Sequence, residues 1–120
     1  MKAALALTIC ALPWTASQAA TSLDGRYTGQ RTAVRGSPPT CPKDGPAAWQ
    51  VTDGRFTFRF WTVNLPVEIA PDGTLKGETQ YSPSHGRPAW LRVEGTVSGG
   101  ALQADAEWRA CQMHYSLTRK

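Results

Sequence analysis

The sequence predicts an all-β protein, a small antiparallel up-and-down meander of about eight strands that closes, or nearly closes, into a barrel. Short runs that alternate apolar and polar side chains recur along the chain, as they do in strands that bury one face. Turn-forming pairs such as Asp53-Gly54 and Gly99-Gly100 separate these runs, and such pairs are typical of hairpins. Two widely spaced cysteines, Cys41 and Cys111, are placed where a bridge would help to close the barrel.

The first residues have the layout of a secretory signal peptide. A positive charge at Lys2 precedes an apolar run over residues 3–12, and small residues follow at Ser17 and Ala19, as a signal peptidase requires. We expect residues 1–19 to be cleaved and the remainder, 20–120, to form a single domain in the periplasm or the secreted medium.

The alternative to cleavage is a retained membrane anchor. Spanning a bilayer takes about 20 apolar residues, and Pro13 interrupts the run before that length is reached. We therefore expect no transmembrane segment once the signal is removed. Without Lys2 the formal net charge falls below the +4 of the full chain, and so weak a basic bias does not indicate nucleic acid as a partner.

The remaining cysteines predict one disulfide. Cys10 leaves with the signal peptide, so Cys41 and Cys111 form the pair that is left, and an exported domain of this size usually bridges such a pair. In an up-and-down meander the loop after the first strand and the start of the eighth strand lie at the same end. A bridge between them would hold the eighth strand beside the first, which is how a barrel closes. A two-sheet β-sandwich is the alternative.

Turn residues and side-chain alternation set the bounds of the expected strands. The strands are expected at residues 25–34, 47–52, 55–62, 65–70, 74–82, 89–98, 101–109 and 111–119. Two-residue turns at 53–54 and 99–100, and a three-residue loop at 71–73 with Gly73 left-handed, fix three registers. The expected cross-strand pairs are Val51 with Phe56, Trp49 with Phe58, Val97 with Leu102, Gly95 with Ala104, Ile69 with Leu75 and Val67 with Gly77.

The barrel interior has two interpretations. Inward positions carry large rings on some strands and small residues on others, and large residues opposite small ones are what a filled core needs. The alternative is a cavity for a small apolar ligand, which would lie on the side of Gly77, Gly95 and Ala104. No cofactor motif accompanies either interpretation.

A row on the outer face is a candidate metal site. If the last two strands join tightly at Arg109-Ala110, Asp105 faces His114, and the preceding register places Glu94 opposite Asp105. Two carboxylates and an imidazole could hold zinc. The alternative is an ordinary solvated surface, and we assign no metal to the chain.

One end of the barrel is the candidate binding surface. Its linkers, 35–46 and 82–88, are long, and long loops on a rigid scaffold often carry function. Basic and aromatic side chains gather at this end. The expected ligand- or partner-binding residues are Arg35, Lys43, Trp61, His85, Arg87, Trp90 and Arg109.

These features favour an exported, non-enzymatic binding module with an anionic envelope component or an acidic protein surface as its partner. Ser84 and His85 are neighbours in sequence, but no acid is placed to orient the histidine. A bridged cysteine pair leaves no thiolate nucleophile. The alternatives are a carrier of a small apolar ligand and a periplasmic inhibitor of an envelope-targeting enzyme.

The opening Asp-Gly-Arg-Tyr-Thr-Gly at residues 24–29 and the closing Cys-Gln-Met-His-Tyr-Ser-Leu at residues 111–117 resemble segments of small exported bacterial proteins of uncharacterised function. The expected architecture is also similar to avidin-like and lipocalin-like barrels and to small periplasmic barrels that inhibit lysozyme. The resemblance implies a barrel. No binding residue of those families has a matching position here.

Overall fold

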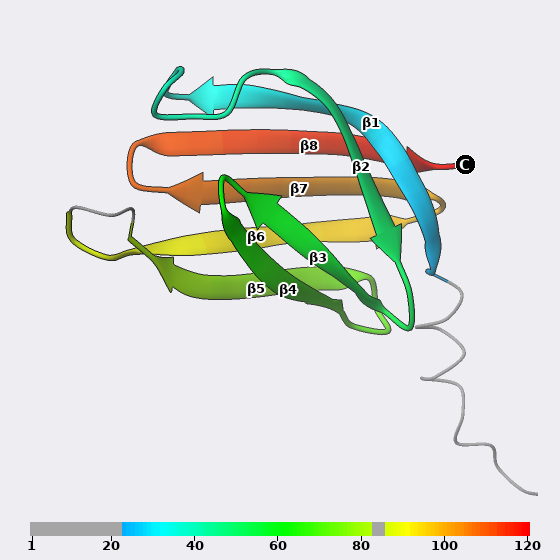
Figure 1. Cartoon of the computed structure of the whole chain (residues 1–120). Coiled ribbons are helices and arrows are strands. Elements are labelled where there is room, and N and C mark those ends of the chain that lie inside the picture. Colours follow the sequence, from blue (N-terminus) through cyan, green and yellow to red (C-terminus); the bar gives the residue numbers. More distant parts are fainter. Residues whose placement is uncertain (1–22, 83–85) are drawn as a thin grey trace, which may run out of the picture.

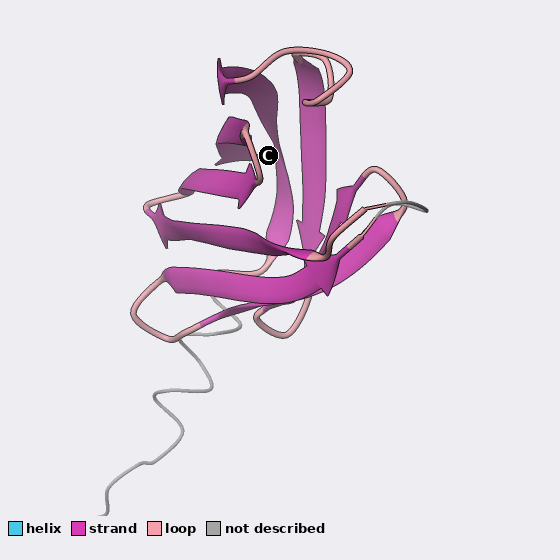
Figure 2. Ribbon diagram, turned by 90° about the vertical axis from the view of Figure 1, so that its left-hand side faces the viewer, coloured by secondary structure: helices cyan, strands magenta, loops and turns pink. Residues whose placement is uncertain are grey.

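The computed structural model describes residues 23–82 and 86–120. The expected signal peptide and His85 lie outside the described residues. Eight strands follow one another: β1 (Gly25–Arg35), β2 (Gly45–Val51), β3 (Arg55–Phe60), β4 (Val63–Ile69), β5 (Thr74–Tyr81), β6 (Ala89–Ser98), β7 (Ala101–Trp108) and β8 (Cys111–Arg119). They form one strongly curled antiparallel sheet (Figure 1), and Figure 2 shows the described part as strands and loops.

The sheet is a nearly closed barrel with a single open seam. The strand order is β2-β1-β8-β7-β6-β5-β4-β3, so β8 pairs with β1 and the two edges belong to β2 and β3. These edges meet only at their turn, where Thr52 and Arg55 form an isolated bridge. The eight-stranded up-and-down meander and its near closure are confirmed.

The predicted disulfide is confirmed as well. Cys41 and Cys111 are bonded with their Cα atoms 5.3 Å apart, and both are fully buried. The bond joins the β1–β2 loop to the first residue of β8, beside a ladder that runs from Tyr27 opposite Arg119 to Ala33 opposite Met113. The bridge therefore fastens the first strand to the last.

Three turns have the predicted form. Asp53-Gly54 and Gly99-Gly100 are left-handed at both positions, which is the type I′ geometry that suits the twist of a hairpin. In the third, Gly73 has a φ of 94° and donates its N–H to the carbonyl of Ala70 at 2.8 Å. The ladders confirm the expected pairs Val97 with Leu102, Gly95 with Ala104 and Ile69 with Leu75.

The pairing of β2 with β3 was predicted wrongly beyond the turn. No ladder joins Trp49 to Phe58 or Val51 to Phe56, because the two strands separate after the Thr52–Arg55 bridge. Their rings still meet: Trp49 stacks on Phe56 with centroids 4.5 Å apart and meets Phe58 edge-on at 5.7 Å. We attribute the seam to the bulk of these rings, which fill the space behind it and hold the edges apart.

The expected pair Val67 with Gly77 is also absent from the ladder, which ends at Glu68 opposite Lys76. Pro66 has no N–H to donate, so the ladder cannot continue through it. Gly77 instead allows a close approach, since a Cβ there would lie 3.0 Å from the Pro66 carbonyl oxygen.

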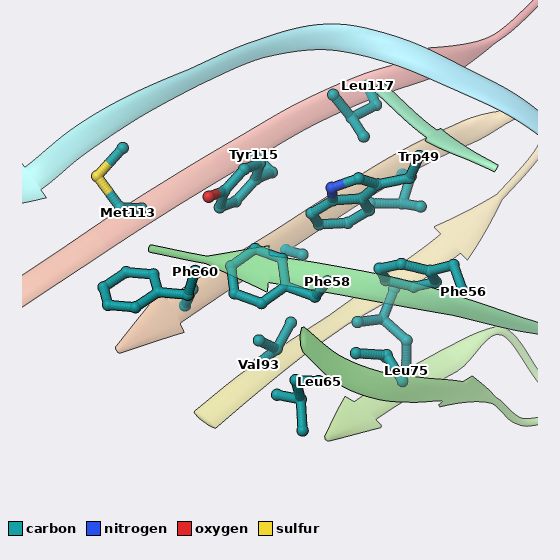
Figure 3. Close-up of a cluster of buried hydrophobic side chains, with 14 of the residues drawn as sticks. Trp49, Phe56, Phe58, Phe60, Leu65, Leu75, Val93, Met113, Tyr115 and Leu117 are labelled. Atoms are coloured by element: carbon teal, nitrogen blue, oxygen red, sulfur yellow. The ribbon is translucent and has the colours of Figure 1, made fainter. Parts of the chain in front are cut away.

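The interior is packed with side chains. A single cluster joins the rings of β2, β3 and β8 to aliphatic residues of β4–β6 (Figure 3). On the side where a ligand cavity was the alternative, Leu75 and Val93 are fully buried and Ala104 is 1% exposed. This packing favours a filled core.

Candidate functional site

The outer-face row forms with the predicted register. Glu94 faces Asp105, and Asp105 faces His114, because Arg109-Ala110 makes a tight turn with Arg109 left-handed at a φ of 54°. His114 Nδ1 lies 3.0 Å from a carboxylate oxygen of Asp105, and Nε2 lies 2.8 Å from Oε1 of Gln103. Both ring nitrogens are therefore engaged within the sheet. In residues 23–82 and 86–120 no group of three or more His, Cys, Asp or Glu is arranged to hold a metal ion.

The described part of the chain also has no helix long and apolar enough to cross a membrane.

Two left-handed residues shape the loop end of the barrel, where the β1–β2, β3–β4, β5–β6 and β7–β8 connections meet (Figure 1). Trp61 opens the β3–β4 turn and Arg109 opens the β7–β8 turn, each with a φ of 54°. A left-handed backbone costs a residue with a Cβ about 1–2 kcal/mol. Such strained residues cluster at ligand-binding positions in other proteins.

The first hollow at this end, which we call the cationic pocket, has a volume of about 620 Å³. It lies at the open seam, between the β1–β2 loop and the end of β3. Its lining residues are Arg31, Pro38, Pro39, Cys41, Pro42, Lys43, Arg59, Trp61 and Tyr115.

Main-chain carbonyls orient the two guanidinium groups of the cationic pocket. Arg31 donates from Nε to the carbonyl oxygen of Lys43 at 2.8 Å, and Arg59 donates from Nε to the carbonyl oxygen of Trp61 at 3.1 Å. Within the described residues neither arginine nor Lys43 forms an ion pair with a carboxylate. The nearest acid in sequence, Asp44, instead accepts the backbone N–H of Ala33 at 2.8 Å. Three cations thus line one hollow without a paired acid in the part of the chain that the structure describes.

Tyr115 gives this pocket a buried hydroxyl. The residue is 4% exposed, and its ring packs against Trp49 and Phe58 with centroids 4.8 and 5.5 Å away. Its oxygen is directed along β8 toward Met113, which lies nearer the loop end (Figure 3), and has no hydrogen-bond partner among the described residues. Burial raises the pKa of Tyr115 to about 12, against an opposing effect of the Arg31 charge. At neutral pH the hydroxyl is protonated, as in any tyrosine, and able to donate.

The second hollow, the aromatic pocket, has a volume of about 700 Å³. Arg109 lies over the ring of Trp108, 4.5 Å from its centroid, and Tyr81 packs against the same ring at 5.0 Å. Pro39 and Trp61 line both pockets, so the two adjoin. The full lining is Pro39, Thr40, Trp61, Thr62, Tyr81, Trp108, Arg109 and Ala110.

The structure brings together three of the residues predicted from the sequence. Lys43 lines the cationic pocket, Arg109 lines the aromatic pocket, and Trp61 lines both. Figure 1 shows the turns that carry Trp61 and Arg109 at the same end as the β1–β2 loop.

The other predicted residues within the described part of the chain line neither pocket. Arg35 forms an ion pair with Glu107 at 3.0 Å and donates to the carbonyl oxygen of Arg109 at 3.5 Å. Trp90 is 46% exposed and lines neither pocket. Arg87 is linked to the site only through its carbonyl oxygen, which accepts a hydrogen bond from Arg109.

The sequence analysis did not single out Arg31, Arg59 or Tyr115 as binding residues. Arg31 lies four residues after Tyr27 in the same strand and therefore points inward as Tyr27 does. An arginine at an inward position indicates a polar site, and this signal was present in the sequence. Arg59 lies on the outward face of β3 and reaches the pocket only because the seam is open. No pattern in the sequence indicates the seam.

The chain matches no protein-family model, no curated protein and no solved structure.

Proposed function

We propose that this protein is an exported, non-enzymatic binding module that holds an anionic ligand at the loop end of its barrel. One observation carries the proposal: Arg31, Lys43 and Arg59 line a single pocket without carboxylate partners in the described residues. Cations left unpaired in a concave site attract an anion, and the low-dielectric wall of the barrel strengthens the attraction.

The apolar walls beside these cations support the same proposal. Trp61 is 42% exposed and stands between the two pockets. A ligand site typically combines apolar walls with a few polar groups in a hollow of about 300–1,000 Å³, and both pockets fall in this range. A ligand could therefore place its charged group near the arginines and its apolar part against the rings.

The alternative of a carrier that holds an apolar molecule inside the barrel is less well supported. Leu75, Leu91 and Val93 are fully buried within the core cluster. An interior ligand would have to displace packed side chains.

Solution NMR tests the proposed site. A panel of carboxylates, phosphates and acidic sugars is titrated at low ionic strength, and binders are expected to shift the amides of Arg31, Lys43 and Trp61. The double variant Lys43→Glu/Arg59→Glu is expected to abolish those shifts, whereas the matched variant Arg26→Glu/Lys76→Glu, with both changes away from the loop end, is expected to retain them. Shifts confined to the opposite turns, or no binder in the panel, would refute the proposed site.

Export is tested separately. The full chain is expressed in a bacterial host, and intact mass is measured on the envelope fraction. We expect a product that begins at residue 20 and contains one disulfide. An unprocessed product in the cytoplasmic fraction would refute export and leave the binding test unaffected.

A further inference from the structure

We propose that the cationic pocket binds a ring-bearing organic acid, with one oxyanion, a carboxylate or a phosphate, between Arg31 and Tyr115 and a flat apolar ring against Trp61. The inference rests on the proposed function and adds the chemical class of the ligand.

Arg31 and Tyr115 are held in place by the ladder between the first and the last strand of the barrel. They are direct partners in the β1–β8 ladder, and both line the pocket. The guanidinium of Arg31 uses its Nε to reach the carbonyl of Lys43 at 2.8 Å, which leaves its two terminal nitrogens to serve a ligand. An arginine that presents two parallel N–H groups suits a carboxylate or a phosphate.

The hydroxyl of Tyr115 supplies the second half of the oxyanion site. A buried hydroxyl without a partner carries a desolvation cost, and a ligand oxygen would remove that cost by accepting a hydrogen bond from it. Two other polar groups on core rings do have partners within the protein. Tyr27 donates to the carbonyl oxygen of Leu23 at 2.7 Å, and Trp108 donates to that of Tyr81 at 3.1 Å. Tyr115 is available to donate because its hydroxyl has no hydrogen-bond partner among the described residues and, like any tyrosine, is protonated at neutral pH.

Lys43 and Arg59 add charge without needing to touch the anion. Arg59 is oriented by its hydrogen bond to the Trp61 main-chain carbonyl at 3.1 Å, which holds its charge at the start of the β3–β4 turn. Both cations deepen the positive potential of the pocket. One acid group on the ligand is sufficient. Of the three pocket cations, Arg31 is the one that faces the buried hydroxyl of Tyr115 across the ladder.

The shape of the walls favours a flat ring as the body of the ligand. Trp61, Pro38, Pro39 and Pro42, whose side chains are all rings, line the pocket. These groups are rigid and lose little conformational freedom on binding. Flat apolar faces of this kind stack on a planar ring, and the volume of about 620 Å³ is ample for two fused rings.

Isothermal titration calorimetry tests the ligand class with four probes: 2-naphthoate, 2-naphthyl phosphate, the neutral 2-naphthamide and inorganic phosphate. We expect at least one naphthyl acid to bind about tenfold or more tightly than the amide, since charge-assisted hydrogen bonds are worth that much. Whichever naphthyl acid binds more tightly shows whether the site prefers a carboxylate or a phosphate group. Equal binding of the amide would overturn the oxyanion site, and equal binding of inorganic phosphate would overturn the ring.

Two variants test the residues. Tyr115→Phe removes only the unpartnered hydroxyl and is expected to weaken the preferred acid about fivefold or more while the protein stays folded. Arg31→Gln is expected to weaken binding of the preferred acid about tenfold or more. Arg31→Lys is expected to have an intermediate effect, because a lysine keeps the charge but lacks the two parallel N–H groups of the guanidinium. Arg26→Gln, on the outer face of β1, is the matched control and should bind normally.

The outcomes separate this inference from the proposed function. If Lys43→Glu/Arg59→Glu abolishes binding of the panel members while Tyr115→Phe and Arg31→Gln bind the naphthyl acids normally, the loop-end site stands and the oxyanion site between Arg31 and Tyr115 is refuted. Binding of none of the four probes to the wild-type protein would refute the ligand class.

Discussion

Arg31 and Tyr115 face each other across the β1–β8 ladder, and both reach the pocket that opens at the seam between β2 and β3. The ladder that positions them is fastened at the loop end by the Cys41–Cys111 bond. Closure of the barrel and construction of the pocket therefore depend on the same pair of strands.

Removing the disulfide should lower the free energy of unfolding without changing the fold. The bond spans 70 residues, and a loop of that length is worth about 4 kcal/mol in the chain-entropy account. Urea unfolding of Cys41→Ala/Cys111→Ala should show this loss, and reduction of the wild-type protein should show a similar one. An unchanged urea midpoint in the double variant would contradict the stabilising role of the bond.

Tyr115 should make stability fall at alkaline pH. Its pKa is raised from 10.0 to about 12 by burial, so the folded state keeps its proton where the unfolded state has lost it. The stabilisation is complete below pH 10 and is lost as the pH rises from about 10 to 12, by about 2–3 kcal/mol. Urea unfolding across this range should show a smaller fall for Tyr115→Phe than for the wild type. Parallel curves for the two proteins would contradict the burial of the hydroxyl.

Gly95 should not tolerate a side chain. A Cβ there would lie 2.1 Å from the carbonyl oxygen of Gln103 on β7, so the strands would have to move apart. Gly95→Ala is expected to destabilise the protein by about 1–3 kcal/mol. Gly45→Ala is the matched control, because the nearest atom to its Cβ, a terminal nitrogen of Arg31, is 3.9 Å away. Thermal unfolding of both variants measures the difference, and equal melting temperatures would contradict the packing described for β6.

Trp61 should contribute to binding and Trp90 should not. The two tryptophans are similarly exposed, at 42% and 46%, but only Trp61 lines the pockets. Trp61→Ala is expected to weaken the preferred naphthyl acid about tenfold, which corresponds to the loss of an apolar stacking face, and Trp90→Ala should leave the affinity unchanged. Calorimetry measures the affinity of each variant for this acid. Equal losses of affinity in the two variants would contradict a specific role for Trp61 and indicate a nonspecific effect of removing an exposed indole.

The hairpins could be predicted from the sequence because they depend on local chemistry, and the disulfide because Cys41 and Cys111 are the two cysteines left after signal cleavage. Gly99-Gly100 and Asp53-Gly54 adopt the left-handed turns that their residues favour. The pairing of β1 with β8 followed from the positions of two cysteines. Side-chain alternation then fixed which residues face inward.

The seam and the pocket could not be predicted in the same way. A suitable turn at Asp53-Gly54 indicates a hairpin, yet β2 and β3 separate after the Thr52–Arg55 bridge, and we attribute this separation to the combined bulk of Trp49 and Phe58 in the interior. That bulk is a property of the packed barrel and not of either strand. Arg59 becomes a pocket residue only through this separation, whereas the inward parity of Arg31 was available from the sequence.

The most direct test of the central claim is to measure NOEs between a bound naphthyl acid and the protein. If the loop-end pocket is the binding site, the naphthalene protons will show contacts to the rings of Trp61 and Tyr115. Contacts to Leu75 or Val93 instead would place the ligand inside the barrel and contradict the account, as would contacts to the outer-face ring of Trp90.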